Sequence, residues 1–113
     1  MSSEHYEQVA FVSWWRKTQP DMLFAIPNGG ARSKPQAGKL KAEGVKQGVH
    51  DLFAPERYLW IEMKVPGGRL SPSQRDFGTR MLAAGYRVMV AWGCADAIEQ
   101  VKHGERASWK NNT

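Results

Sequence analysis

Residues 49–65 read VHDLFAPERYLWIEMKV, and the fold that the sequence predicts is arranged around this stretch. It contains two largely apolar runs, residues 49–54 and residues 57–65, each of strand length. Pro55 ends the first run, because proline lacks the N–H group that a strand ladder needs. Two strands joined by a short polar link are typical of a hairpin, so we expect residues 49–54 to pair with residues 58–64.

The second strand of this hairpin has two chemically different faces. Side chains alternate between the faces of a strand. One face is apolar and is expected in the core; it consists of Leu59, Ile61 and Met63. Glu62 and Lys64 project from the opposite face, and Trp60 on the same face indicates that this surface is covered as well.

Acidic side chains from both strands are expected to meet on that second face. Asp51 approaches Glu62 across the predicted ladder, and the ammonium group of Lys64 lies beside them. Two neighbouring carboxylates repel each other unless a cation joins them, and carboxylate oxygens suit Mg²⁺ or Mn²⁺. The pattern therefore indicates a divalent-metal site, with a cross-strand salt bridge on a solvated face as the alternative.

The flanking sequence predicts six further elements. In chain order they are a helix over 4–17 capped by Ser3, a strand over 22–26, a short helix between Pro35 and Gly44, a helix from Ser71-Pro72 to Gly85, a strand over 86–92, and a helix over 96–102. In the first helix, Tyr6, Val9, Ala10 and Trp14 are expected to form the apolar stripe, and Phe11 is a candidate fifth member. The order is αβαββαβα, which favours an α/β fold with a mixed sheet flanked by helices.

Composition limits the class of protein. The chain has 113 residues, enough for one domain over 1–113, with a polar tail after about residue 104. One cysteine, Cys94, excludes an internal disulfide, and the widely separated histidines show no zinc-ligand spacing. No apolar run approaches the ~18 residues that span a bilayer, so we expect a cytoplasmic protein with no membrane partner. Sixteen Lys and Arg against eleven Asp and Glu give a net charge of +5, which favours a polyanionic partner.

Four short motifs, in this order along the chain, resemble those of one nuclease family. They are Pro27-Asn28-Gly29-Gly30-Ala31-Arg32, Gly48-Val49-His50-Asp51, Ile61-Glu62-Met63-Lys64 and Gly68-Arg69-Leu70-Ser71-Pro72-Ser73-Gln74. Together they resemble the VRR-NUC nucleases, the virus-type replication–repair branch of the PD-(D/E)xK superfamily. The resemblance extends from about Glu4 to Val101 and implies a restriction-endonuclease-like core.

The resemblance also implies roles for individual residues. Asp51 and Glu62 would bind the metal, Mg²⁺ or Mn²⁺, together with the backbone carbonyl of Met63. Lys64 would hold the attacking water or stabilise the charged phosphorane, and Gln74 would help to orient that water or Lys64.

The resemblance also covers the first helix, and the chain departs from it at the residue before the aspartate. Glu4 and Gln8 match the family's E-x-x-x-Q pair, with Glu4 as an outer or second-metal carboxylate; Glu7 is the alternative if the register is shifted. The family commonly has proline before the aspartate, whereas this chain has His50, for which we expect a wedge or DNA-facing role rather than a metal ligand.

The segment between the first two motifs is suited to contact with a nucleic-acid backbone. Glycines allow a phosphate to approach the main chain, and basic side chains neutralise its charge. The candidate residues are Asn28, Gly29, Gly30, Arg32, Lys34, Lys39 and Lys41, with a solvated loop and helix face as the alternative. No base-reading helix is evident, so recognition of DNA shape is favoured. Of the five tryptophans, Trp15 or Trp109 is expected at an interface or stacked on bases.

Together, these features predict that the protein is a metal-dependent, structure-specific DNA endonuclease. Small nucleases of this superfamily resemble archaeal-type Holliday junction resolvases, which implies a homodimer that cleaves branched DNA by metal-assisted hydrolysis. The implied setting is the cytoplasm of a bacterial or phage-infected cell. The alternatives are a flap- or nick-directed nuclease, a non-catalytic nucleic-acid-binding module on the same fold, and an interaction protein with no nucleic-acid role.

Overall fold

Four strands form one mixed sheet in the order β1-β2-β3-β4. The computed structural model describes residues 3–27 and 34–104. In chain order the elements are α1 (Glu4–Thr18), β1 (Phe24–Ala25), α2 (Lys34–Ala42), β2 (Leu52–Ala54), the 3₁₀ turn η1 (Pro55–Arg57), β3 (Leu59–Lys64), α3 (Pro72–Ala83), β4 (Arg87–Trp92) and α4 (Cys94–His103). The predicted order of helices and strands is confirmed, with η1 added between the hairpin strands.

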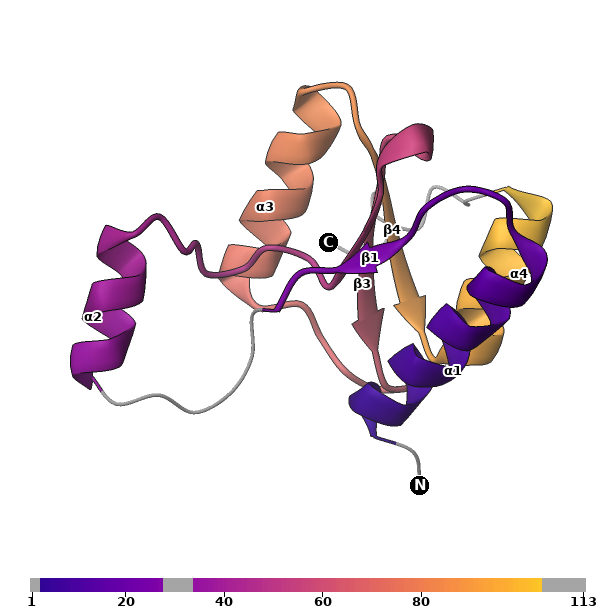
Figure 1. Cartoon of the computed structure of the whole chain (residues 1–113), viewed down its shortest axis with the longest axis horizontal. Helices are drawn as coiled ribbons and strands as arrows, with labels where there is room; N and C mark the ends of the chain where they lie inside the picture. Colours follow the sequence, from indigo (N-terminus) through magenta and orange to yellow (C-terminus); the bar gives the residue numbers. More distant parts are fainter. Residues whose placement is uncertain (1–2, 28–33, 105–113) are drawn as a thin grey trace.

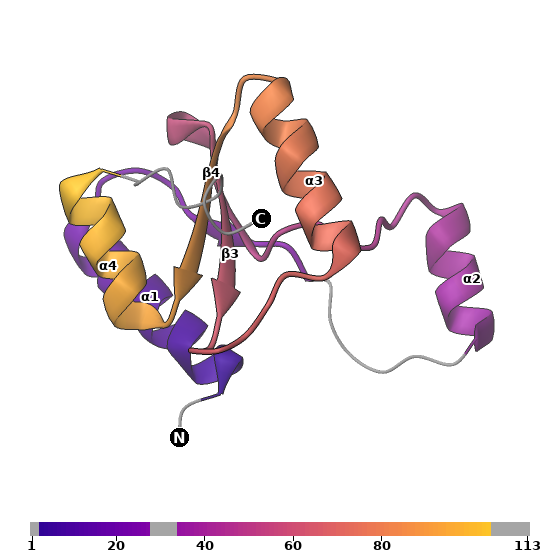
Figure 2. The ribbon, with the colours of Figure 1, turned by 180° about the vertical axis from the view of Figure 1, so that it is seen from behind.

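The sheet lies between two helical layers. Helices α1 and α4 pack side by side on one face, and α3 covers the other (Figures 1 and 2). Helix α2 stands apart from both layers on the α3 side. Strands β1–β2 and β2–β3 pair antiparallel, and β3–β4 pair parallel, so β3 has a hydrogen-bonded neighbour on each side.

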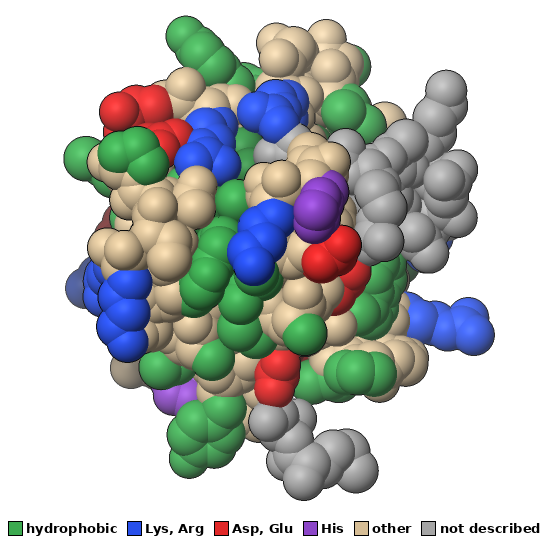
Figure 3. Space-filling view, turned by 90° about the vertical axis from the view of Figure 1, so that its right-hand side faces the viewer, with side chains coloured by type: hydrophobic (Ala, Val, Ile, Leu, Met, Phe, Trp, Pro, Cys, Tyr) green, Lys and Arg blue, Asp and Glu red, His purple; other side chains and the backbone are tan. Residues whose placement is uncertain are grey.

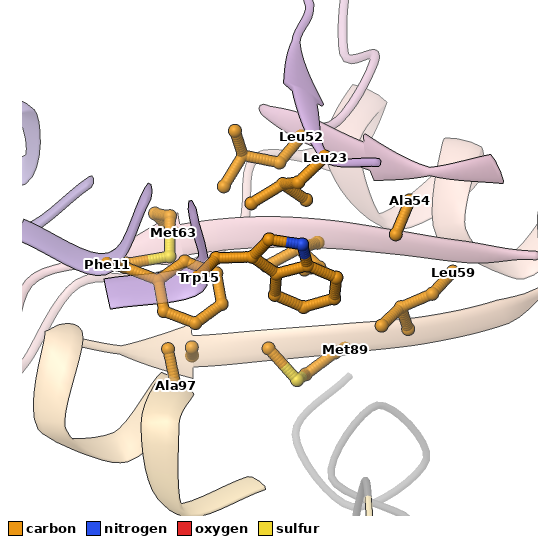
Figure 4. Packing of buried hydrophobic residues seen from close by; sticks show 11 residues of the cluster. Phe11, Trp15, Leu23, Leu52, Ala54, Leu59, Met63, Met89 and Ala97 are labelled. Atoms are coloured by element: carbon orange, nitrogen blue, oxygen red, sulfur yellow. The ribbon is translucent and has the colours of Figure 1, made fainter. Parts of the chain in front are cut away.

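Alternation along β3 divides the core as expected. Leu59, Ile61 and Met63 are fully buried beneath the α1/α4 layer, where they pack with Phe11, Trp15, Leu23, Leu52 and Met89. The Trp15 indole lies near the centre of this cluster (Figure 4). On the other face, Trp60 packs with a smaller cluster formed by Leu70, Val88 and Val90. Both faces of β3 are therefore covered, which is unusual for a strand that carries charged residues.

The first hairpin strand is shorter than the sequence predicts. We expected a strand over 49–54, but β2 begins at Leu52 and pairs with Ile61. The Asp51 side chain extends the ladder beyond that point, because its Oδ2 accepts the N–H of Met63 at 2.7 Å. Pro55 does end the strand, and the turn closes through Tyr58, whose φ of 53° is left-handed.

The apolar stripe predicted for the first helix is confirmed for Phe11 and Trp14, which pack in or against the core, and wrong for Tyr6, Val9 and Ala10. Tyr6 and Val9 are 68% and 52% exposed, whereas Phe11 and Trp15 are buried. The inward face also carries a carboxylate, because Glu7 Oε1 accepts the N–H of Cys94 at the start of α4. A search for apolar residues at helical spacing could not detect a face that contains a capping acid.

The interface role expected for Trp15 is also wrong. This side chain is 1% exposed, and its Nε1–H donates to the carbonyl oxygen of Asp21 at 2.8 Å. The guanidinium carbon of Arg57 lies 4.4 Å from the ring centroid, and Arg57 also pairs with Asp21. Trp15 therefore anchors α1 to the hairpin turn. Trp109 lies outside the described residues.

The outer surface of the α1/α4 layer is mixed. Hydrophobic side chains remain visible there, and Lys and Arg side chains are dispersed around them rather than gathered into one patch (Figure 3). Over the part of the chain that the structure describes, no helix is both long and apolar enough to cross a bilayer.

One glycine controls how the loop before β2 meets α3. Gly48 has a φ of +89°, and a Cβ added to it would lie 2.5 Å from the backbone C and O atoms of Ser73. No real Cβ tolerates such a distance, so a side chain here would force the loop and the first turn of α3 apart.

Replacing Gly48 with alanine is therefore expected to destabilise the fold strongly. Gly67 is a matched control, because its φ is +85° but nothing lies within 4 Å of the place that a Cβ would occupy. Gly67→Ala should cost about 1 kcal/mol from the left-handed backbone alone. Gly48→Ala should cost about 3 kcal/mol or more, since backbone displacement is added. Urea unfolding of both variants measures the difference, and equal midpoints would contradict the packing described here.

Candidate metal centre

Three carboxylates from separate elements converge at one end of the sheet. Glu4 comes from the first turn of α1, Asp51 directly precedes β2, and Glu62 lies in β3. One oxygen from each lies within 4.8 Å of the others. The sequence predicted that Asp51 and Glu62 would approach each other, and it left the choice between Glu4 and Glu7 open. The structure brings Glu4 to this group and uses Glu7 to cap α4.

Asp51 is held from both sides by its neighbouring strands. Its Oδ2 accepts the Met63 N–H, and its backbone oxygen accepts the N–H of Ile26 at 2.8 Å. Burial raises the pKa of the Asp51 carboxyl, while the hydrogen bond from Met63 and the charge of Lys64 act in the opposite direction. The carboxylate is thus fixed in place by its contacts with β3.

Glu62 is the most deeply buried acid of the group. Its side chain is 1% exposed, and neither carboxylate oxygen has a hydrogen-bond partner within residues 3–27 and 34–104. Burial raises its pKa to about 8, and the negative charge of Asp51 adds to this. Lys64 partly offsets both effects, because its Nζ lies 3.5 Å from Glu62 Oε2.

These features fit a hard divalent cation. Buried polar atoms are normally hydrogen-bonded, so two buried carboxylate oxygens that accept no hydrogen bond, beside two further carboxylates, need an explanation. An ion of the Mg²⁺ or Mn²⁺ type binds through such oxygens and would remove the repulsion among them. The donor set, three carboxylates with one nearby ammonium, therefore suits the metal that the sequence predicts.

Glu4 and Gln8 lie on the same side of α1. Glu4 has a pKa raised chiefly by burial, with Lys64 lowering it and Asp51 raising it further. Lys64 and Asp51 also act on the pKa of Glu62, so Glu4 and Glu62 experience the charges of the same two groups. Gln8 lies one turn further along and is half-buried.

Lys64 and Gln74 occupy the two ends of the connection from β3 to α3. Lys64 is 8% exposed at the end of β3. Gln74 forms a capping box, in which its Oε1 accepts the N–H of Ser71 and its own N–H donates to Ser71 Oγ. The Gln74 side chain therefore shapes the start of α3.

His50 does not face solvent, so the DNA-facing alternative is wrong. Its side chain is fully buried, and its ring centroid lies 4.9 Å from that of Phe77. Burial lowers the pKa of His50 to about 4, and the nearby charge of Lys64 lowers it too. Its Nε2 lies 2.8 Å from the backbone oxygen of Gln74. Sequence reasoning could not find this contact, because a backbone carbonyl leaves no signature in the sequence.

The candidate DNA-binding residues are only partly described. Lys39 and Lys41 are exposed on α2, and Lys34 is the first residue of that helix. Asn28, Gly29, Gly30 and Arg32 lie outside the described residues.

Comparison with known proteins gives two findings. The model of the VRR-NUC domain family matches residues 2–95. A solved structure titled "VRR_NUC domain protein" is similar with a TM-score of 0.76 and 22% identity, over 91% of this chain and 88% of that chain. At this identity the likeness shows the fold, a restriction-endonuclease-like mixed sheet flanked by helices. No curated protein sequence matches the chain.

The buried Glu62 predicts a specific pH dependence of stability. In the unfolded chain its pKa is near 4.5, against about 8 in the folded, metal-free protein. Between these values the folded state binds more protons, so the free energy of unfolding falls as pH rises, by a few kcal/mol at most. Urea unfolding at about pH 5 and about pH 8.5 in chelator should show this loss.

Glu62→Gln should remove most of that slope, because glutamine is neutral throughout. Glu43→Gln is the matched control, since Glu43 is exposed beyond the end of α2. A wild-type slope that survives in Glu62→Gln would contradict the assignment of the titration to this carboxyl.

Proposed function

The chain belongs to the VRR-NUC domain family, a family of nuclease fold, and we propose that it is a divalent-metal-dependent endonuclease that hydrolyses phosphodiester bonds in DNA. The observation that carries the proposal is the group formed by Glu4, Asp51 and Glu62, with Lys64 paired to it. A protein that only binds DNA gains nothing from buried acids beside a phosphate site, so this group favours catalysis over a non-catalytic module.

The acids would hold the ion. Asp51 and Glu62 are the proposed ligands together with the backbone carbonyl of Met63, and Glu4 is an outer or second-metal ligand. When bound, Mg²⁺ or Mn²⁺ supplies a Lewis acid that polarises the phosphate and lowers the pKa of bound water. Asp51 is fixed by β3 through Met63, so little reorganisation of this ligand is needed.

Lys64 is proposed as the catalytic cation. Its position two residues after Glu62 on the same strand face directs the ammonium toward the acids. There it holds the attacking water or offsets negative charge on the phosphate oxygens in the transition state. Gln74 and Gln8 are proposed to help orient the water or Lys64.

The basic segment is proposed as the DNA contact. Lys39 and Lys41 on α2 would neutralise phosphates, together with Lys34, Asn28, Gly29, Gly30 and Arg32. Backbone contacts of this kind carry no sequence information, so the enzyme would recognise the structure of its substrate.

We further propose branched DNA such as a Holliday junction as the substrate, in the cytoplasm of a bacterial or phage-infected cell. In this proposal residues 1–113 are a single nuclease domain, and its described residues hold one cluster of three carboxylates, whereas a junction needs two symmetric cuts. A C2 homodimer would supply two equivalent sites. Cleavage of flaps or nicks by a monomer is the competing possibility.

A cleavage assay tests this function directly. Labelled four-way junction, flap, nicked and linear duplex DNA are incubated with Mg²⁺, Mn²⁺ or chelator, and the mass of the protein is measured by sedimentation. We expect metal-dependent paired nicks in the junction and twice the chain mass of 12.7 kDa. Asp51→Asn and Glu62→Gln should lower the rate by about 10³-fold or more, and Lys64→Met by about 10²-fold with Mn²⁺ binding retained.

The control is Glu43→Gln, an exposed acid that should leave the rate unchanged. Cleavage in chelator, or at the wild-type rate in folded Asp51→Asn, would refute the metal assignment. DNA binding without any cleavage would favour the non-catalytic module, and a monomer that cuts only flaps or nicks would remove the junction proposal.

DNA affinity should depend on salt and on α2. Each phosphate contact contributes about 0.9 to the slope of log affinity against log salt concentration on duplex DNA. Replacing Lys39 and Lys41 by alanine should reduce that slope by up to about two units and lower the affinity for all DNA sequences equally. Lys102→Ala, an exposed site on α4, is the control. An unchanged slope in the α2 variant would show that Lys39 and Lys41 do not contact the DNA phosphates.

A further inference from the structure

The loop that carries Asp51 is docked against the first turn of α3 at two points. Gly48 lies so close to Ser73 that no side chain fits between them. Two residues later, the His50 ring reaches the backbone oxygen of Gln74, with 2.8 Å between Nε2 and O. The next residue is Asp51. The proposed metal ligand therefore follows immediately after a side chain that is anchored to another element.

The partner of this hydrogen bond determines which ring nitrogen of His50 carries a hydrogen. A carbonyl oxygen only accepts, so Nε2 must carry the hydrogen and donate it. The ring is fully buried and packs against Phe77, which itself makes an edge-to-face contact with Trp60. His50 is thus an oriented donor enclosed by α3 and β3.

Asp51 is consequently restrained from two directions. Its carboxylate accepts the Met63 N–H of β3, while the preceding side chain donates to α3. If the bond to α3 were lost, the loop could move away from the sheet, because β2 begins only at Leu52. Asp51 would then be held beside Glu62 only from the sheet, by the Met63 N–H on its carboxylate and the Ile26 N–H on its backbone oxygen.

We propose that His50 is a positioning residue whose Nε2–H bond to the Gln74 carbonyl holds Asp51 in the arrangement that binds the metal. The inference rests on the proposed function for its relevance to catalysis, but the placement of Asp51 can be measured without metal or DNA.

The rival explanation is that the ring only fills space in the core. Two substitutions of similar shape separate these roles. Glutamine retains an N–H near the position of Nε2, whereas methionine has similar length but no donor. His50→Asn is a third variant, polar like glutamine but one methylene too short to reach the carbonyl. Phe77→Leu removes the ring packing and leaves the hydrogen bond.

Three quantities are measured on the full chain. They are the hydrogen-exchange rate of the Met63 amide in chelator, the Mn²⁺ affinity by calorimetry, and the thermal midpoint. We expect His50→Met and His50→Asn to raise the Met63 exchange rate and weaken Mn²⁺ binding, each by about tenfold. His50→Gln should stay within about threefold of wild type in both. Phe77→Leu should lower the thermal midpoint but keep wild-type Mn²⁺ affinity.

Each outcome decides the proposal. Equal behaviour of His50→Gln and His50→Met, or Phe77→Leu weakening Mn²⁺ binding as much as His50→Met, would show that only packing matters. If His50→Met does not fold, the pair His50→Gln and His50→Asn makes the same comparison. If wild-type protein binds no Mn²⁺ and cuts no DNA, the proposed function fails, and the Met63 exchange rates alone decide whether His50 positions Asp51.

Discussion

The site depends on the position of β3, a strand that is hydrogen-bonded on both sides and covered on both faces. Alternation then sends Met63 into the core and Glu62 toward the opposite face, with no freedom to exchange them. Burying a carboxylate is costly, and the cost is offset by the apolar packing around Trp15 beneath the same strand. The core in Figure 4 therefore does more than stabilise the fold, because it fixes the strand from which Glu62 projects.

The acids meet because α1 and β2 begin, and β3 ends, at the same end of the sheet. Glu4 starts α1, Asp51 precedes β2, and Glu62 is near the end of β3. In the absence of metal, burial and then the nearby charge of Asp51 raise the pKa of Glu62, which weakens the fold at neutral pH. Proteins commonly accept such local instability at functional sites, where the bound ligand compensates for it.

Much of this arrangement could be predicted from the sequence, and the failures have physical causes. The alternation of Glu62 and Lys64 with apolar residues is a local property of a strand, so the faces of β3 and the pairing with β2 were predictable. The choice between Glu4 and Glu7 was not, because both lie in the first turns of α1 and the packing of α4 decides which one turns inward. The role of His50 was hidden for a similar reason, since its partner is a backbone oxygen 24 residues away. Residue types encode side-chain chemistry, but they do not encode which carbonyl a folded chain presents.

In the proposed function, the same geometry separates the lysines of α2, which would contact DNA, from the carboxylates that would bind the metal. Helix α2 stands apart from the helical layers, so its lysines can change without disturbing the core (Figure 1). The chain that leaves α2 reaches Asp51 only after it has been fixed to α3 at Gly48 and His50. If DNA bound to α2 and displaced it, the contacts of Gly48 and His50 with α3 would resist the movement before it reached the Asp51 carboxylate. The loop thus allows the segment proposed to contact DNA to vary while Glu4, Asp51 and Glu62 stay close together.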